Sequence, residues 1–101
     1  MMKLTTMLKS AAVAAIIASP AVAETTLRIQ THYAPETVSG KLAGQFVDDV
    51  QTMSGGDIKI EMFYSSSVVA TVETFDAAAN GILDCDMTGG AYQTGKNAGF
   101  Q

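Results

Sequence analysis

The amino-acid sequence predicts an α/β fold, in which three parallel strands alternate with two helices in the order β-α-β-α-β. Residues 26–31 and 58–63 alternate apolar and polar side chains, which is the period of a strand, and residues 83–88 form a third, shorter strand. Between these strands, residues 39–53 and 71–82 carry apolar side chains at helical spacing. Strand–helix–strand units with short connections are crossovers, so the three strands should be parallel.

Residues 1–23 have the three parts of a cleaved secretory signal peptide. Lys3 and Lys9 give a positive start, residues 11–18 form a short apolar run, and residues 21–23 (AVA) form an A-x-A cleavage site. The apolar run is far shorter than the roughly 20 residues that a spanning helix needs, so we expect no stable membrane insertion after cleavage. The mature part is then an α/β domain over residues 24–101.

The composition of this mature part excludes two classes of partner. The whole chain has a formal net charge of −4, and loss of Lys3 and Lys9 lowers it by two, to −6. An acidic exported chain without basic clusters is a poor partner for nucleic acid or an anionic membrane surface. The single cysteine, Cys85, cannot form an internal disulfide, and its place in the third strand predicts a buried small hydrophobic residue.

Each element has its own boundary signals. The first strand ends at His32, because Pro35 follows and favours a turn. The first helix ends at Gly55 and Gly56, and Gly81 marks the end of the second, since glycine readily adopts the positive φ of a helix C-terminus. The apolar faces that the helices should bury are formed by Leu42, Ala43, Phe46, Val47, Val50 and Met53 in the first helix and by Val72, Phe75, Ala79 and Ile82 in the second.

The topology predicts a binding edge. The likeness to doubly wound sheets puts the first strand between the other two, with one helix on each face, and ligands bind such sheets beyond the carboxyl ends of the strands. His32 and Tyr33 follow the first strand, Tyr64 follows the second, and Tyr92 follows the third. We therefore expect these residues on one rim of the sheet, where they form a binding site.

Two short motifs suggest enzymatic alternatives. Residues 90–97 (GAYQTGKN) nearly match the phosphate-binding G-x-x-x-x-G-K-[ST], but Asn97 replaces the hydroxyl residue that should hold Mg²⁺. Asp84 and Asp86 begin a D-x-D-x-T motif, which is the nucleophile signature of the haloacid dehalogenase phosphohydrolases. That chemistry needs the first aspartate at the end of a buried strand, whereas Asp84 lies near the start of one. A small phosphohydrolase that uses Asp84 and Asp86 is the alternative function.

No metal site is predicted from the residues themselves. The spacing of Asp84, Asp86 and Thr88 resembles a calcium loop, but Gly95 stands where the loop needs a glutamate. His32 is the only histidine, and a lone histidine does not make a metal site.

Three segments carry a resemblance to a known family. Residues 54–63 (SGGDIKIEMF), 72–84 (VETFDAAANGILD) and 89–100 (GGAYQTGKNAGF) follow one another at the spacing found in the solute-binding proteins of TRAP transporters. The chain is most similar to the branch that binds 2-oxo acids and related carboxylates. The resemblance implies the parallel-sheet portion of the first domain of a two-domain periplasmic solute-binding protein, which is not an enzyme. Since family members are much longer, it also implies that residues 24–101 are an incomplete N-terminal domain.

The resemblance implies a ligand, partners and site residues. Such a receptor captures a small organic acid, here a 2-oxo acid or a dicarboxylate, and delivers it to the membrane subunits of a sodium-driven TRAP transporter. Tyr92 occupies the place of a ligand-contacting aromatic residue, and His32 and Tyr33 lie in the first rim loop. No cofactor is expected within this chain. The carboxylate-binding arginine, and a metal ion that bridges protein and ligand in the oxo-acid branch, would depend on residues beyond position 101.

Overall fold

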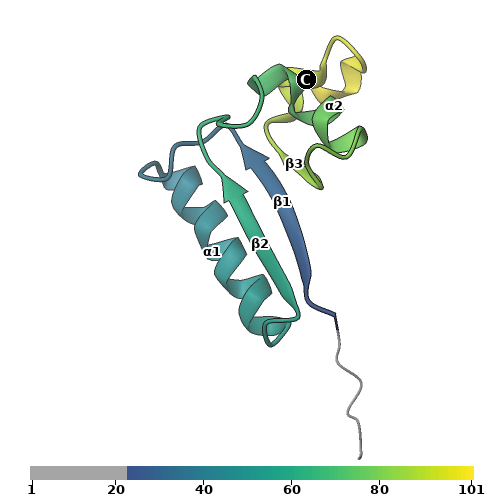
Figure 1. Ribbon diagram of the computed structural model, residues 1–101. Coiled ribbons are helices and arrows are strands. Elements are labelled where there is room, and N and C mark those ends of the chain that lie inside the picture. Colours follow the sequence, from purple (N-terminus) through teal and green to yellow (C-terminus); the bar gives the residue numbers. More distant parts are fainter. Residues whose placement is uncertain (1–22) are drawn as a thin grey trace, which may run out of the picture.

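The computed structural model describes residues 23–101 and confirms the predicted order of elements (Figure 1). The strands are β1 (Thr25–Thr31), β2 (Ile58–Phe63) and β3 (Cys85–Met87), and the helices are α1 (Val38–Met53) and α2 (Thr74–Ala79). Short 3₁₀ turns cover Thr71–Glu73, Gly90–Gln93 and Ala98–Phe100. The predicted signal peptide lies outside the described residues, apart from Ala23. No helix within residues 23–101 is long and apolar enough to cross a membrane.

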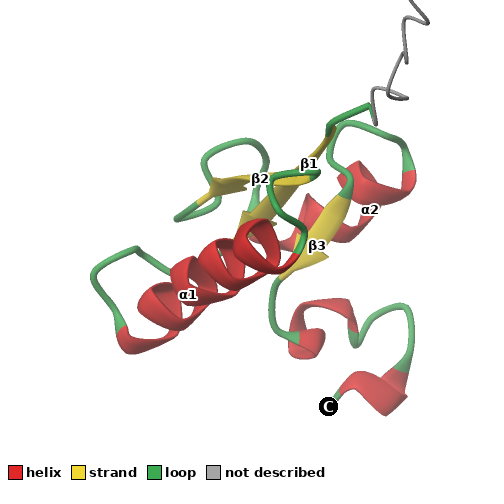
Figure 2. Cartoon of the chain, turned by 90° about the horizontal axis from the view of Figure 1, so that it is seen from below, coloured by secondary structure: helices red, strands yellow, loops and turns green. Residues whose placement is uncertain are grey.

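The three strands form one parallel sheet in the order β2-β1-β3, as predicted. Thr25 to Gln30 of β1 pair in register with Ile58 to Phe63 of β2. The pairing with β3 is shorter and joins Ile29 to Cys85 and Thr31 to Met87. Figures 1 and 2 show the sheet between α1 on one face and α2 on the other, which is the arrangement that two right-handed crossovers produce.

Helix α1 has capping interactions at both ends. The Thr37 hydroxyl accepts a hydrogen bond from the N–H of Gly40 at 3.0 Å and donates to the carbonyl of Ala34 at 2.7 Å, so it closes the turn that leads into the helix. At the other end, Gly55 and Gly56 have positive φ values of 62° and 88°. The predicted glycine stop is therefore confirmed.

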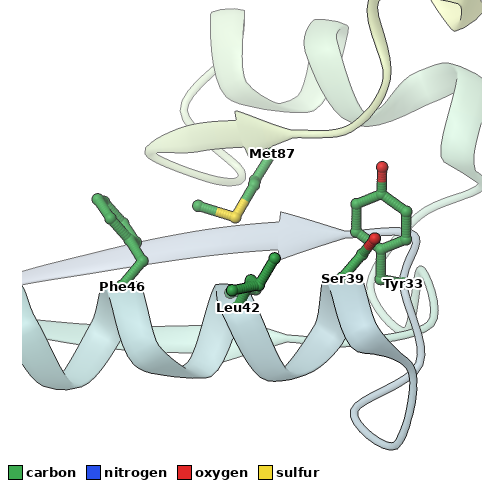
Figure 3. Close-up of a pocket in the computed structure, with 6 residues that line it drawn as sticks. Tyr33, Ser39, Leu42, Phe46 and Met87 are labelled. Atoms are coloured by element: carbon green, nitrogen blue, oxygen red, sulfur yellow. The ribbon is translucent and has the colours of Figure 1, made fainter.

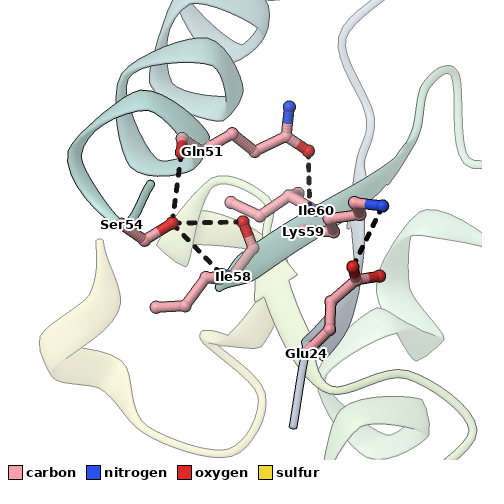
Figure 4. A network of polar contacts seen from close by, with 6 residues as sticks. All are labelled: Glu24, Gln51, Ser54, Ile58, Lys59 and Ile60. Atoms are coloured by element: carbon pink, nitrogen blue, oxygen red, sulfur yellow. Dashed lines mark hydrogen bonds and ion pairs between the residues drawn. The ribbon is translucent and has the colours of Figure 1, made fainter. Parts of the chain in front are cut away.

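The corner between α1 and β2 is closed by two polar side chains (Figure 4). The Ser54 hydroxyl accepts from the N–H of Ile58 at 3.1 Å and donates to the carbonyl of Gln51 at 3.2 Å. The Gln51 side-chain oxygen accepts from the N–H of Ile60 at 3.1 Å. These bonds satisfy backbone donors of β2 that do not pair with β1, and they fix the start of the strand against the helix.

The predicted apolar face of α1 is only partly correct. Ala43 is buried, and Val47 and Val50 are half-buried against the sheet. Leu42 and Phe46, however, are 61% and 43% exposed, and Met53 is exposed as well. The helix packs mainly against β2. Leu42 and Phe46, on the other side of the stripe, point toward Met87 of β3 (Figure 3).

The predicted apolar face of α2 is wrong. Thr74 and Ala77 are the buried residues of this helix, whereas Val72, Phe75 and Ile82 are exposed. The α-helix begins three residues later than predicted, after the 3₁₀ turn, and the strand below it presents a buried polar side chain, Gln30, to Thr74. A small polar residue therefore occupies the position facing the sheet.

The third strand is shorter than predicted: residues 83–88 were expected, but only Cys85–Met87 form a β-strand. Leu83, just before the strand, is among the most buried residues of the described chain. Cys85 is a free cysteine and is half-buried, so it is less buried than the sequence predicts.

Gly40 is predicted to be indispensable for the close approach of α1 to the turn before it. A Cβ atom at this position would lie 1.9 Å from the carbonyl oxygen of Ala34, which is backbone and cannot move aside. We expect Gly40→Ala to lower the free energy of unfolding by about 1–3 kcal/mol despite the higher helix propensity of alanine. Urea unfolding followed by circular dichroism measures this change.

Gly44→Ala is the matched control on the same helix. Its Cβ would meet only the hydroxyl of Tyr64, at 3.2 Å, and that side chain can move. We expect stability within about 1 kcal/mol of the unsubstituted protein. Equal losses for the two variants would contradict the steric role of Gly40.

Candidate binding rim

The structure brings together three of the residues that the sequence assigned to the rim. His32 follows β1, and its ring centroid lies 4.0 Å from that of Tyr33. The ring of Tyr92, which follows β3, meets His32 edge-on with centroids 5.1 Å apart. These three aromatic side chains, His32, Tyr33 and Tyr92, form a cluster that we call the aromatic rim. They come from loops beyond the carboxyl ends of two adjacent strands, where open parallel sheets bind ligands.

Tyr64 does not join this cluster. Its hydroxyl lies 3.2 Å from the position that a Cβ would take on Gly44, in the second turn of α1. The side chain therefore folds back onto the helix although the residue itself follows β2. The prediction that all three tyrosines share one rim is wrong for the side chain of Tyr64.

The short turn after β3 places Tyr92. The N–H of Tyr92 donates to the carbonyl of Gly89 at 3.1 Å, which closes the first 3₁₀ turn after the strand. A Cβ on Gly89 would stand 3.8 Å from the Tyr92 ring and 3.9 Å from His32, so Gly89 lies directly beneath both rings. Tyr92 remains 43% exposed, so part of the residue is accessible.

The aromatic rim is rich in neutral hydrogen-bonding groups. Two tyrosine hydroxyls and the imidazole of His32 can donate to a carboxylate or carbonyl oxygen. The Nδ1 atom of His32 is buried and has no hydrogen-bond partner among the residues that the structure describes. Leaving such a buried atom without a partner costs stability unless a further group or a water molecule satisfies it.

A groove beside the aromatic rim was not predicted from the sequence. A groove of about 370 Å³ lies between α1 and β3 (Figure 3). It is lined by Tyr33, Ser39, Leu42, Ala43, Phe46 and Met87. Leu42 and Phe46 were assigned to the core because their spacing is helical, and spacing alone cannot tell which part of an apolar face the sheet covers. Tyr33 belongs to both the groove and the aromatic rim, so the two are continuous.

The two enzymatic motifs have other roles in the structure. Residues 90–93 form a 3₁₀ turn and residues 94–96 are a further turn, so Gly95 and Lys96 do not open an α-helix as they would in a phosphate-binding loop. Lys96 instead forms an ion pair with Asp76 and lies 4.9 Å from the centroid of the Phe75 ring. These contacts attach the C-terminal segment to α2.

Asp84 is a structural residue. Its carboxylate accepts from the backbone N–H of Arg28 at 2.8 Å and from the Arg28 Nε at 3.4 Å, and Arg28 also donates to the carbonyl of Gly81 at 3.0 Å. Asp86 accepts from the N–H of Thr88 at 2.8 Å, which closes the turn after the strand. Asp84 lies before β3 and not at its carboxyl end, so the arrangement does not fit a phosphohydrolase nucleophile.

The described residues offer no ready metal site. Within residues 23–101, no group of three or more histidine, cysteine, aspartate or glutamate side chains could hold a metal ion.

Residues 29–101 match the family described as bacterial extracellular solute-binding protein, family 7. The match covers most of the chain, so the protein belongs to this family, the solute-binding proteins of TRAP transporters. The resemblance seen in the sequence is confirmed. Members of this family bind solutes and are not enzymes, which overturns the phosphohydrolase alternative.

Solved structures show the same fold. A TRAP periplasmic solute-binding protein of Rhodobacter sphaeroides, in an apo open structure, is 27% identical with a TM-score of 0.70, and the match covers 74% of this chain and 24% of that one. A Bordetella pertussis receptor that binds pyroglutamic acid is 21% identical, with a TM-score of 0.71 over 75% of this chain and 25% of that one. A Pseudoalteromonas atlantica protein with bound sodium and pyruvate is 18% identical, with a TM-score of 0.69 over 76% of this chain and 24% of that one. The chain thus spans about a quarter of the length of these structures.

The contacts of Asp84 predict how stability changes in acid. The hydrogen bond from the Arg28 backbone lowers the pKa of Asp84 below its ordinary value of 3.8, desolvation opposes this change, and the charge and side-chain hydrogen bond of Arg28 lower the pKa further. Because the folded-state pKa is the lower one, the stabilisation is complete above pH 3.8 and is lost as the pH falls through the folded-state pKa.

We therefore expect Asp84→Asn to be less stable than the unsubstituted protein at neutral pH, and the difference should shrink in acid. Urea unfolding from neutral pH down to about pH 2.5 measures it. Asp49→Asn, which removes one carboxylate from the exposed side of α1, is the control and should match the unsubstituted protein at neutral pH. A stability difference for Asp84→Asn that stays constant down to the lowest pH would contradict this prediction.

Proposed function

We propose that this protein is a periplasmic receptor that captures a small organic acid, a 2-oxo acid or a dicarboxylate, for sodium-driven uptake by a TRAP transporter. Membership of the solute-binding family supports the class of function. The aromatic rim is the observation that carries the proposal, because it gathers His32, Tyr33 and Tyr92 where parallel sheets bind ligands. Two structural relatives are described with pyroglutamic acid and with pyruvate, and both ligands are small carboxylic acids.

Each rim residue has a role that suits such a ligand. The exposed part of Tyr92 can pack against a short carbon skeleton while its hydroxyl donates to a carboxylate or keto oxygen. Tyr33, on the other side of His32, supplies a second hydroxyl. His32 contacts both rings, so it helps to hold them in place at the rim.

The remaining requirements of binding are assigned to other parts of the receptor. The aromatic rim has no arginine, because Arg28 is engaged with Asp84 and the carbonyl of Gly81. A carboxylate-binding arginine would come from the second domain. A metal ion that bridges protein and ligand would also be held there, and the Pseudoalteromonas atlantica relative is described with bound sodium and pyruvate. No cofactor is proposed within this chain.

The proposed partners are the organic acid and the membrane subunits of the transporter. The family is periplasmic, and the signal peptide predicted over residues 1–23 is the route of export. The acidic mature part argues against nucleic acid as a partner, and no stable membrane insertion is proposed after cleavage.

Tyr92→Phe tests the binding role directly. The substitution keeps the ring and removes one hydrogen bond to a charged group, which is worth roughly 1.5–3 kcal/mol, so affinity should fall about ten- to a hundredfold. Isothermal titration of the full-length receptor with pyruvate, pyroglutamate and succinate measures the change.

Tyr64→Phe is the matched control, because its hydroxyl lies over α1, and it should bind as the unsubstituted receptor does. Equal affinities of the Tyr92→Phe and unsubstituted receptors for every acid that binds would rule out the hydrogen bond. If Tyr92→Ala also bound normally, Tyr92 would have no part in the site.

Export should produce a mature protein that begins at Glu24. The expected cleavage follows Ala23, because small residues at positions 21 and 23 are what the peptidase accepts. Intact-mass spectrometry of protein from the periplasmic fraction measures the N-terminus. Ala23→Leu is the control and should accumulate as the uncleaved precursor, and a periplasmic product that retained Met1 would show the prediction to be wrong.

A further inference from the structure

We propose that Gln30 is a positioning residue for the aromatic rim. Its buried carboxamide holds the two loops that lie on either side of the aromatic cluster, and so sets the place of Tyr92 without touching it. The expected loss of ligand affinity on changing Gln30 rests on the proposed function. The expected change in the position of the His32 and Tyr92 rings does not.

The carboxamide of Gln30 uses its full hydrogen-bonding capacity inside the protein. The side chain is 0% exposed. Its Nε2 donates to the carbonyl of Val69 at 3.0 Å and to the hydroxyl of Thr74 at 2.7 Å. Its Oε1 accepts from the N–H groups of Val68 and Val69 at 2.8 and 3.1 Å. Both donors and both lone pairs are therefore satisfied, and no apolar side chain of the same size could replace these bonds.

These bonds fix the loop between β2 and α2 against the end of β1. Ser65 and Ser66 have positive φ values of 55° and 50°, a conformation that serine rarely adopts. Their N–H groups donate to the carbonyls of Tyr33 and Thr31, both at 3.0 Å. The loop is thus held at one end by the backbone of the rim and at the other by Gln30, and these anchors help to maintain the unfavourable backbone of Ser65 and Ser66.

The same carboxamide acts on the other side of the rim through α2. Thr74, its hydrogen-bond partner, is the first residue of α2 and follows the 3₁₀ turn Thr71–Glu73. The carbonyl of Val72 in that turn accepts from the Nε2 of Gln93 at 3.4 Å. Gln93 is itself buried and is the neighbour of Tyr92 in the chain. The turn that carries Tyr92 therefore rests on a segment that Gln30 holds in place.

Gln30→Met tests this inference in the full-length protein. Methionine has a similar size and offers none of the four hydrogen bonds. We expect the amide protons of Val68 and Val69 to exchange with solvent about tenfold faster, since each loses its acceptor. We also expect the nuclear Overhauser contact between the His32 and Tyr92 rings to weaken or disappear, because Tyr92 loses its fixed support.

Gln51→Met is the matched control. Gln51 also accepts a backbone hydrogen bond, from Ile60, but at the corner between α1 and the amino end of β2, whereas the rim lies beyond the carboxyl ends of β1 and β3. It should affect stability and leave the His32–Tyr92 contact unchanged. An unchanged contact in folded Gln30→Met, or an equal change in Gln51→Met, would overturn the inference. If Gln30→Met does not fold, Thr74→Val replaces it as the test, because it removes only one of the four hydrogen bonds of Gln30. A weakened contact between the His32 and Tyr92 rings in Thr74→Val supports the inference, and an unchanged contact overturns it.

A binding measurement separates this inference from the proposed function. We expect Gln30→Met to weaken pyruvate binding about tenfold, and to weaken it by less than about threefold when Tyr92→Phe is already present, because both changes act through one contact. If the two substitutions instead weakened pyruvate binding additively, Tyr92 would not be the group that Gln30 positions. If pyruvate, pyroglutamate and succinate all fail to bind while the ring contact responds as expected, the proposed function fails and the positioning role stands.

Discussion

The structure depends on β1 being paired along both edges. It is joined to β2 over residues Thr25 to Gln30 and to β3 over Ile29 to Thr31, always in parallel. Parallel neighbours on both sides require two crossovers, and the right-handed sense of each puts α1 and α2 on opposite faces of the sheet. The carboxyl ends of all three strands then meet at one edge. The aromatic rim exists because this edge is where the loops after β1 and β3 come together.

Two polar side chains of β1 explain the unusual character of the face that α2 covers. Arg28 and Gln30 are two residues apart, so they point to the same face of the strand. Arg28 reaches Asp84 and the carbonyl of Gly81, and Gln30 reaches Thr74 and the loop before α2. The contacts of Arg28 and Gln30 on this side of the sheet are therefore hydrogen bonds. They hold specific loops in place, which apolar packing against a helix would not do. This is why Thr74 faces the sheet while Val72 and Phe75 remain exposed.

The other face has the opposite chemistry. The groove between α1 and β3 is lined mainly by Leu42, Ala43, Phe46 and Met87, and only Tyr33 and Ser39 bring hydroxyl groups to it. An apolar lining offers a carboxylate little compensation for the water that it loses. The aromatic rim, with the imidazole of His32 and the hydroxyls of Tyr33 and Tyr92, offers hydrogen-bond donors. The groove and the rim are continuous through Tyr33, and the proposal places the small acid at the rim because its donors can compensate a carboxylate.

Local patterns in the sequence determined the order of elements, their parallel arrangement and the placement of His32, Tyr33 and Tyr92 near one edge. These features follow from side-chain period, glycine stops such as Gly55 and Gly81, and the handedness of crossovers, all of which act over short stretches of chain. Only the tertiary structure decided which part of each apolar stripe is buried, because that depends on where the sheet ends beneath the helix. It also decided that Tyr64 turns back onto α1, and that Asp84 pairs with Arg28 in place of a catalytic role. The network around Gln30 joins residues 38 to 44 positions apart in the chain, and no pattern of neighbouring residues encodes such contacts.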